Sequence, residues 1–352
     1  MKSISFIMMA ALLPAAAGAQ QLKLTSAVHA DQGKVTIYQE WPERRVVDTP
    51  RLSGHQVSCQ LPQAAAVYRV SLRKPFADAT VLAEEGKPVT ITITKDSQVV
   101  VRGGVLQQRW DDFLQSVAPD EAAWSDVGRR YEKATDLDAK LKIAREMDHY
   151  SGSVQQARLH FAVQNAGNLA GAWMAYSYAF AWTPESLKKL TPLFRQQPAA
   201  SATYAVLKEK QAAAAAVSMT GKQAPVFTLS AIDGQQVALD SFIRQHQYVL
   251  LDVWASWCTP CRAGNRALAA HYEELQQKGI GFISVSVDEN KDLWKKAVVA
   301  DKIPWTQLVS PHGMKSDFVN AYKVQSLPAT FLINREGTII QQHIEIEDLK
   351  KL

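Results

Sequence analysis

The stretch Asp252-Val253-Trp254-Ala255-Ser256-Trp257-Cys258-Thr259-Pro260-Cys261 decides the fold of the C-terminal part of this chain. Residues 248–254 form an almost continuous apolar run, which is typical of a β-strand buried on both faces. Pro260 suits the first turn of a helix, where its missing N–H group costs nothing. The pattern therefore predicts a buried strand that leads into a helix over residues 260–278, with the two cysteines at the junction.

The place of Cys258 at the start of this predicted helix favours reactivity. Unsatisfied N–H groups and the positive end of the helix dipole stabilise a thiolate there. The thiolate is the attacking species in disulfide exchange. We therefore expect Cys258 to be the attacking and more exposed sulfur. Cys261, one turn inside the helix, is expected to be the resolving thiol that closes the internal disulfide.

Other uses of a Cys-x-x-Cys pair find less support in the sequence. A structural zinc site takes about four ligands, but the nearest histidine, His271, lies on the same predicted helix and the chain has no second cysteine pair. A haem attachment motif has a histidine after its second cysteine, and Arg262 stands there. A plain structural disulfide stays open. We expect no metal, and no cofactor beyond a redox-active Cys258–Cys261 disulfide.

The residues around this junction alternate between strand and helix patterns. Asp233-Gly234 is typical of a tight hairpin turn. The other predicted elements are strands at 226–229, 281–287, 330–334 and 338–343, a helix at 291–300 and a short acidic helix at the end. Residues 218–352 are therefore expected to form an α/β domain, with a central mixed sheet flanked by helices.

The rest of the chain predicts two further parts, because 352 residues exceed what one hydrophobic core usually serves. Residues 20–104 show the alternation of β-strands, most clearly at 88–94, and indicate a small, mainly-β domain. Residues 105–217 change to helical periodicity, with a helix start predicted at Thr183-Pro184.

The third cysteine, Cys59, is far in sequence from the pair. It shares an apolar face with Val57 and Leu61 of a predicted strand. This placement favours a core thiol, which behaves as a small apolar side chain, over a redox role.

Residues 1–19 have the features of a signal peptide. Lys2 supplies a positive start, residues 4–13 are an apolar run, and Ala17-Gly18-Ala19 is a small-x-small pattern that favours cleavage before Gln20. The run is too short to span a bilayer comfortably. We therefore expect an exported protein, periplasmic in a Gram-negative source and otherwise extracytoplasmic, without stable membrane insertion.

Several motifs from residue 223 onward occur in an order and spacing that resemble a known family. They are Ala224-Pro225-Val226-Phe227-Thr228-Leu229, the Asp233-Gly234 turn, Trp254-Ala255-Ser256-Trp257-Cys258-Thr259-Pro260-Cys261-Arg262, Pro304-Trp305 and Leu327-Pro328-Ala329-Thr330-Phe331-Leu332-Ile333. On these motifs, residues 223–352 resemble the TlpA/ResA-like thiol–disulfide oxidoreductases of the thioredoxin superfamily. The upstream part is similar to N-terminal modules of exported relatives, a weaker match that names no residues.

The resemblance implies roles for residues outside the cysteine pair. Pro328 matches the family's cis-proline, which sits against the pair and leaves the backbone of Leu327 free to bond an extended substrate strand; a cis peptide is credible only before proline. Asp252 matches a buried acid, whose raised pKa would let it shuttle the proton of Cys261. Without the resemblance, Pro328 would be only a residue that precedes a strand, and Asp252 would be only a residue that ends one.

The residues beside Cys258 are expected at the substrate surface. Trp257 is implied to shape that surface, and Thr259 and Pro260 tune the redox potential. The chain also departs from the family. Many relatives have Glu three residues and Pro five residues after the second cysteine, where this chain has Gly264 and Arg266. The lysine that often partners the buried acid is absent from residues 281–287.

The resemblance implies disulfide exchange with thiols or disulfides of protein substrates, through a mixed disulfide on Cys258 that Cys261 resolves. In exported relatives the usual direction is reductive, fed by a membrane electron donor such as a DsbD-like protein.

Two other function classes find less support in the sequence, and one alternative stays open. A peroxiredoxin needs Pro-x-x-x-Thr-x-x-Cys, and Leu251 and Ala255 occupy its Pro and Thr positions. The net charge of +5 is small and forms no basic stripe, so nucleic-acid binding is not expected. The alternative that stays open is a binding or chaperone-like module, in which the N-terminal part holds a partner and the cysteine pair is secondary.

Overall fold

The computed structural model describes residues 20–27, 33–63, 65–73 and 76–352. The predicted signal peptide, residues 1–19, lies outside the described residues. The chain divides into two compact units. One runs to Ala122 and includes Ser151–Ala212, and the other combines Ala123–Tyr150 with Ala213–Leu352. Within the described ranges, no helix has both the length and the apolar character needed to cross a membrane.

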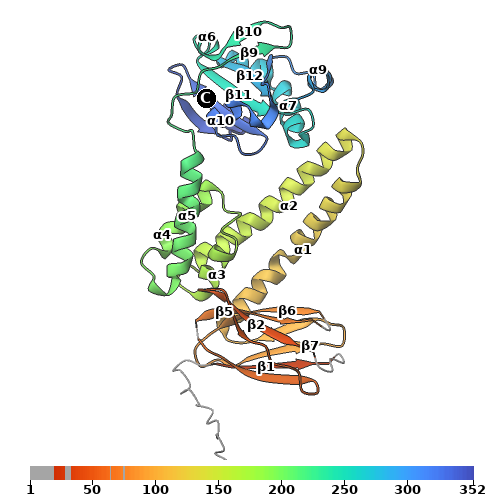
Figure 1. Cartoon of the computed structure of the whole chain (residues 1–352), viewed down its shortest axis with the longest axis vertical. Helices are drawn as coiled ribbons and strands as arrows, with labels where there is room; N and C mark the ends of the chain where they lie inside the picture. The colour runs from red at the N-terminus through yellow and green to blue at the C-terminus, as the bar shows by residue number, and fades with distance from the viewer. Residues whose placement is uncertain (1–19, 28–32, 64, 74–75) are drawn as a thin grey trace, which may run out of the picture. The chain divides into compact units, whose positions relative to one another are not determined.

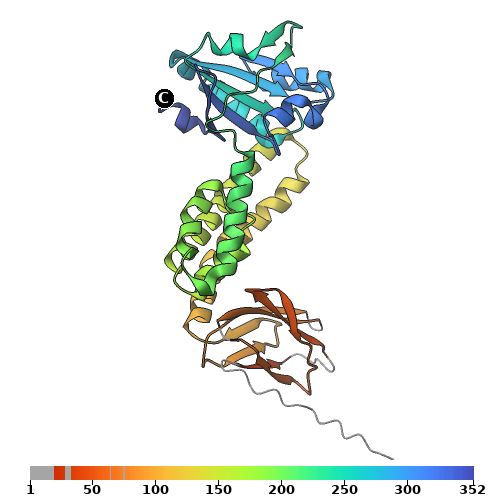
Figure 2. The same ribbon diagram turned by 60° about the vertical axis from the view of Figure 1, so that its left-hand side comes forward.

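The N-terminal strands form two four-stranded β-sheets that face one another (Figures 1 and 2). The strand order is β4-β1-β7-β8 in the first sheet and β3-β2-β5-β6 in the second. Strands β1 and β7 pair in parallel, and the other neighbours pair antiparallel. The strands are β1 (Gln20–Ser26), β2 (Val35–Trp41), β3 (Arg45–Asp48), β4 (Gln56–Leu61), β5 (Ala66–Leu72), β6 (Ala77–Ala83), β7 (Val89–Ile93) and β8 (Val99–Arg102).

One buried apolar cluster fills the space between the two sheets, because alternate residues of each strand point inward. Leu22 and Leu24 come from the first sheet, and Ile37 and Val70 from the second. Cys59, on β4, is half-buried and packs against this cluster. Burial raises the pKa of its thiol to about 11, so that little of it is ionised near neutral pH.

Helices follow the sandwich, as the helical periodicity predicts (Figure 1). They are α1 (Val105–Lys133), α2 (Leu137–Gln164), α3 (Leu169–Ser177), α4 (Pro184–Phe194), the short 3-10 helix η1 (Pro198–Ala200) and α5 (Ser201–Val217). Helix α4 begins at the predicted place, where Oγ1 of Thr183 accepts the backbone N–H of Ser186 at 3.2 Å and caps the helix. Secondary structure changes at the predicted limits of residues 105–217, which stay predictions as domain boundaries.

A seven-stranded sheet with the order β10-β9-β13-β12-β11-β14-β15 is the centre of the C-terminal part (Figures 1 and 2). Strands β11, β12 and β13 are parallel and the outer pairs antiparallel, so the sheet is mixed, as predicted. The strands are β9 (Thr228–Ala231), β10 (Gln236–Ala238), β11 (Tyr248–Trp254), β12 (Ile280–Ser286), β13 (Thr306–Val309), β14 (Ala329–Asn334) and β15 (Ile339–Gln342). The helices are α6 (Leu239–Ile243), α7 (Thr259–Ala270), α8 (Tyr272–Gln277), α9 (Lys291–Ala300), η2 (Gly313–Lys315), α10 (Asp317–Ala321) and α11 (Ile346–Leu349).

Helices cover both faces of this sheet. On one face, the ring of Tyr272 from α8 packs 5.3 Å from that of Phe282. On the other, the ring of Tyr322, which follows α10, packs 5.1 Å from that of Phe331. Phe282 and Phe331 lie opposite consecutive residues of β11, whose side chains point to opposite faces. Since both faces are covered, the central strands β11 and β12 are buried along almost their whole length, and most of their residues are apolar.

The structure corrects two local predictions and adds short elements that were not predicted. The strand expected at 226–229 begins at Thr228, and Val226 is 77% exposed. The helix expected over 260–278 is two helices, because the backbone of His271 leaves the helical region between them. Strand β13 and helix α10 were not predicted, since four and five residues are too short to show a period.

Candidate active site

The two cysteines lie at the start of α7. Cys258 is the N-cap residue, and its Sγ atom accepts the backbone N–H of Cys261 at 3.3 Å. Pro260 lies in the first turn, where it gives up no helical hydrogen bond. The two sulfurs form a disulfide, with the Cα atoms 5.3 Å apart. The sulfur of Cys258 therefore meets the unsatisfied N–H groups at the positive end of the helix.

The disulfide is nearly covered, whereas residues beside it are exposed. Cys258 is 6% exposed and Cys261 2%, so Cys258 is the more exposed cysteine by a small margin. Trp257 is 64% exposed, Pro260 is also exposed, and Thr259 is half-buried. A protein that approaches the sulfurs thus meets the Trp257 indole and the Pro260 ring first.

The sheet places Leu327 and Pro328 at the edge where the cysteines lie. Strand β11 leads into the cysteine loop at its carboxyl end, and β14 begins with Ala329, which pairs with Val253 close to that end. The peptide bond between Leu327 and Pro328 is cis. Pro328 is exposed and Leu327 is half-buried.

Asp252 is buried near the end of β11, on the sheet face that α8 covers. Oγ of Ser284, directly across on β12, donates to Oδ2 of Asp252 at 3.0 Å. Burial raises the pKa of the Asp252 carboxyl group to about 7, and the hydrogen bond from Ser284 opposes this rise. The sequence showed that a lysine is absent from this strand, but it did not show that Ser284 faces the acid.

Asp288, which the sequence analysis missed, holds the loop that precedes the cysteines. Its buried carboxylate accepts hydrogen bonds from the backbone N–H of Ser256 at 2.7 Å and from the Ser256 hydroxyl at 2.6 Å. It also accepts from the hydroxyl of Ser286 at 2.7 Å. These charge-assisted bonds fix the backbone two residues before Cys258. The signal in the sequence was an acid just after a buried strand, which alone is too common to assign.

Asp301, also missed, anchors the cysteine helix at the end of α9. Its side chain is fully buried and accepts two hydrogen bonds from Arg262, Nε at 2.6 Å and Nη2 at 2.9 Å. Nε of Arg266 donates to the same carboxylate at 2.7 Å. Arg266 stands where many relatives are expected to have proline, so this departure provides an ion pair between α7 and the end of α9.

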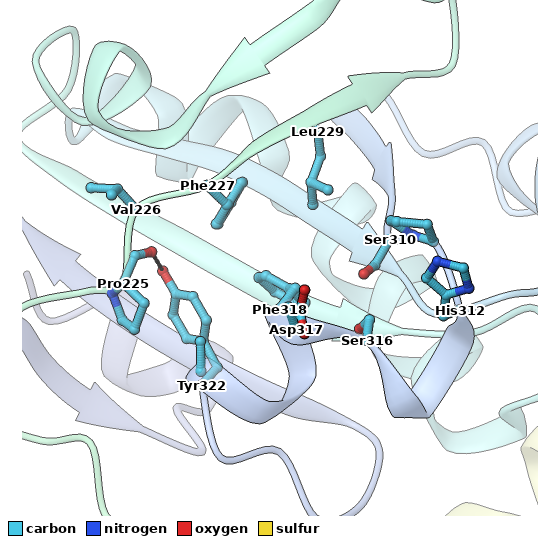
Figure 3. A pocket seen from close by; sticks show the side chains of 12 residues that line it. Pro225, Val226, Phe227, Leu229, Ser310, His312, Ser316, Asp317, Phe318 and Tyr322 are labelled. Atoms are coloured by element: carbon cyan, nitrogen blue, oxygen red, sulfur yellow. Dashed lines mark hydrogen bonds between the residues drawn. The ribbon is translucent and has the colours of Figure 1, made fainter.

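A pocket of about 310 Å³ lies beside the end of β13, among residues outside the predicted site (Figure 3). Its wall combines the segment before β9, the loop after β13 and α10. The rings of Phe227 and Phe318 are 5.1 Å apart, and the Tyr322 hydroxyl donates to the carbonyl oxygen of Pro225 at 2.8 Å. The pocket is mainly apolar and contains neither cysteine.

The metal-site alternative finds no ligand set in the part of the chain that the structure describes. There, no three or more His, Cys, Asp or Glu residues are grouped so that they could hold a metal ion. His271, weighed above as a zinc ligand, has its Nδ1 atom 3.3 Å from Oε2 of Glu274 on the neighbouring helix.

A Cys-x-x-Cys pair at a strand–helix junction of a mixed α/β sheet defines a thioredoxin-like protein, and comparisons with known proteins agree. A model of the AhpC/TSA family matches residues 220–342. The thiol-disulfide oxidoreductase ResA of Bacillus thuringiensis subsp. konkukian is 28% identical over 122 residues, which cover 35% of this chain and 68% of the relative. ResA of Geobacillus thermodenitrificans is 30% identical over 134 residues, 37% of this chain and 74% of the relative.

Among solved structures, the thioredoxin domain of a thiol-disulfide oxidoreductase from Bacteroides vulgatus is 31% identical. The match covers 38% of this chain and 93% of that chain, with a TM-score of 0.35.

The chain belongs to the ResA/TlpA-like family of the thioredoxin superfamily, as its motifs predict, and is a thiol–disulfide oxidoreductase. The family match begins at residue 220, so the sandwich and the helices that follow it lie outside it.

Proposed function

We propose that this chain reduces disulfides of client proteins outside the cytoplasm, with Cys258 as the attacking sulfur and Cys261 as the resolving one. The observation that carries these roles is the N-cap position of Cys258, whose Sγ accepts the N–H of Cys261 at 3.3 Å. A hydrogen bond from a backbone N–H favours the ionised sulfur, and so does the positive end of the helix. Cys261 lies deeper, which suits the sulfur that acts second.

The exchange starts from the reduced pair. The Cys258 thiolate attacks one sulfur of a client disulfide, so that a mixed disulfide forms and the client's other sulfur leaves as a thiolate. Cys261 then loses its proton and attacks Sγ of Cys258, which closes the Cys258–Cys261 disulfide and releases the client's remaining sulfur. Two electrons pass from the cysteine pair to the client. The proton of Cys261 leaves for solvent, and the two client thiolates take up their protons from solvent.

Asp252 is the group that we assign to accept the proton of Cys261. It is buried on the face covered by α8, the continuation of the cysteine helix. Burial raises the pKa of its carboxyl group to about 7. A group with a pKa near the working pH both takes up and gives up a proton readily, so Asp252 is suited to pass this proton to solvent.

The client is expected to bind along the edge that holds the cysteines. Trp257 supplies an exposed aromatic surface, and Thr259 and Pro260 flank the attacking sulfur. The backbone of Leu327, before the cis peptide bond, is assigned to pair with an extended client segment.

Export and the reductive direction rest on the sequence. Residues 1–19 have the pattern of a signal peptide, and the TlpA/ResA-like proteins that the chain resembles are usually reductants. A reductase outside the cytoplasm depends on electrons supplied through the membrane. We therefore infer that a membrane thiol donor of the DsbD type reduces the Cys258–Cys261 disulfide after each exchange.

The test is insulin reduction by the full chain, with a thiol reductant as electron source. Cys258→Ser is expected to fall to the uncatalysed rate, because the attacking sulfur is gone. Cys59→Ser, which removes a thiol outside the proposed site, is the matched control and is expected to keep the wild-type rate. In a separate reaction, Cys261→Ser is reduced, freed of the reductant and mixed with insulin; it is expected to stop at a mixed disulfide, recovered as an adduct that added reductant releases.

A Cys258→Ser variant as active as the wild type would exclude disulfide exchange through the cysteine pair. The binding or chaperone-like module would then be the remaining hypothesis. An adduct that forms through Cys261 in a Cys258→Ser variant, and not through Cys258, would reverse the two roles.

A further inference from the structure

Two consecutive hydrogen bonds end on Asp252. The Nε1–H group of Trp305 donates to Oγ of Ser284 at 2.8 Å, and this Oγ donates to Oδ2 of Asp252 at 3.0 Å. All three residues are buried, so water does not compete for these bonds. The Trp305 ring is itself held by two aromatic neighbours, Tyr272 at 5.7 Å and Phe282 at 5.6 Å.

The direction of these bonds follows from the donors. An indole N–H group can only donate, and a serine hydroxyl has a single proton. Because Trp305 occupies one lone pair of Ser284 Oγ, the Ser284 proton is directed at the Asp252 carboxylate. A protonated Asp252 still has an oxygen that accepts this proton, but a hydrogen bond to an ionised carboxylate is stronger than one to a neutral acid. The arrangement therefore favours the ionised form of Asp252.

The residues that face Asp252 from the adjoining strands carry no charge. Ser284 on β12 and Thr330 on β14 lie directly across from it. The titratable groups at the start of α7 are Cys258, Cys261 and Arg262, and the guanidinium group of Arg262 is paired with Asp301. Ser284 is thus the neighbour whose hydrogen bond favours the carboxylate over the protonated acid.

We propose that Ser284, oriented by Trp305, is a positioning residue for the resolving step, which holds the Asp252 carboxylate ready to accept the proton of Cys261. The inference rests on the role of Asp252 in the proposed function. Burial already raises the pKa of Asp252 to about 7. Loss of the Ser284 hydroxyl removes the opposing effect, so the carboxyl group stays protonated to higher pH.

The experiment separates attack from resolution in the full chain, in a Cys59→Ser background. Reduced protein is mixed with an aromatic disulfide that releases a coloured thiolate, Ellman's reagent, over a range of pH. The first release reports attack by Cys258, and the second reports resolution by Cys261. The attack phase is therefore an internal control for the intact fold and helix start.

Ser284→Ala is expected to move the midpoint of the resolution profile upward by about one pH unit, a tenfold slower resolution below the midpoint, with attack unchanged. Ser284→Thr keeps the hydroxyl and is expected to keep the wild-type midpoint. Trp305→Phe keeps an aromatic ring but loses the N–H group, and is expected to shift the profile in the same direction by less.

A Ser284→Ala profile that superimposes on the wild type overturns the inference, and so does an equal slowing of attack and resolution. The infrared band of the protonated Asp252 carboxyl, assigned by its loss in Asp252→Asn, gives a readout without turnover, and its titration is expected to move upward in Ser284→Ala. Resolution that is unchanged in Asp252→Asn defeats the proposed role of Asp252 together with the inference. Resolution that depends on Asp252 but not on Ser284 defeats the inference alone.

Discussion

Burial of Asp252 couples a proton of the site to the stability of the fold. An ordinary aspartate titrates near 3.8, and burial raises the pKa of Asp252 to about 7. Between these two values the folded state keeps a proton that the unfolded state has lost. The free energy of unfolding therefore falls as pH rises through this window, and the loss is complete above the folded-state pKa.

Asp252→Asn is expected to abolish this pH dependence and to be more stable than the wild type at about pH 8. A shift of about three pKa units corresponds to a difference on the order of 4 kcal/mol. Urea unfolding of the oxidised proteins at about pH 4 and pH 8 measures it. Asp240→Asn, at an exposed carboxylate, is the control and should follow the wild type. An Asp252→Asn variant less stable than the wild type at the higher pH would contradict the expectation.

At the scale of elements, the position of helix α7 is held by an ion pair with a residue outside the helix. The fully buried carboxylate of Asp301 holds Arg262 and Arg266 of this helix. Asp301→Ala leaves both guanidinium groups without that partner. Removal of one partner from a buried ion pair typically destabilises a protein by about 3–5 kcal/mol. We expect a loss of this size in urea unfolding.

The matched control for Asp301→Ala is Asp240→Ala, which removes the carboxylate of the exposed Asp240–Arg244 pair on α6. Exposed pairs contribute less than about 1 kcal/mol, so this variant is expected to unfold close to the wild type. Equal losses in the two variants would show that burial of Asp301 does not decide its contribution.

Helices and strands differ in how well the sequence predicts them. The apolar run of β11 and the capped start of α4 were predicted because each is a continuous local pattern. Strand β13 is short and includes Gln307, so its pattern is not distinctive. The split between α7 and α8 depends on the backbone of the single residue His271, which no periodicity indicates.

The residues of the candidate site also differ in how well the sequence predicts them. Cys258, Cys261 and Asp252 lie within one continuous motif, so their neighbourhood was evident from the sequence. Ser284 is 32 residues from Asp252, and Asp301 is 39 residues from Arg262. These residues come together because β11 pairs with β12 and because α7 packs against the end of α9. A single sequence shows neither of these long-range contacts.

In the whole molecule, the C-terminal part has a hydrophobic core of its own. Every residue of its buried apolar cluster lies between Met219 and Leu349. A fragment Ala213–Leu352 is therefore expected to fold alone and to keep the reduction potential of the full chain. For a reductase that potential is expected near that of thioredoxin, about −270 mV.

Equilibration of the fragment and of the full chain with glutathione or dithiothreitol buffers measures both potentials. A fragment that unfolds, or whose potential differs clearly from that of the full chain, would show that the N-terminal part shapes the redox site. A value near −120 mV, that of a strong oxidant, would reverse the proposed direction.

Cys59 affects how many free thiols the chain has in each redox state, and its low reactivity limits how many electrons the chain takes up. The two other cysteines are joined to each other, so the oxidised chain has one thiol and the fully reduced chain three. The raised pKa of Cys59 keeps its thiol protonated and slow to react. Cys59 is therefore not expected to exchange with the Cys258–Cys261 disulfide. One equivalent of a dithiol then supplies the two electrons that the Cys258–Cys261 disulfide takes up, and a partly reduced population at equilibrium is a mixture of two species.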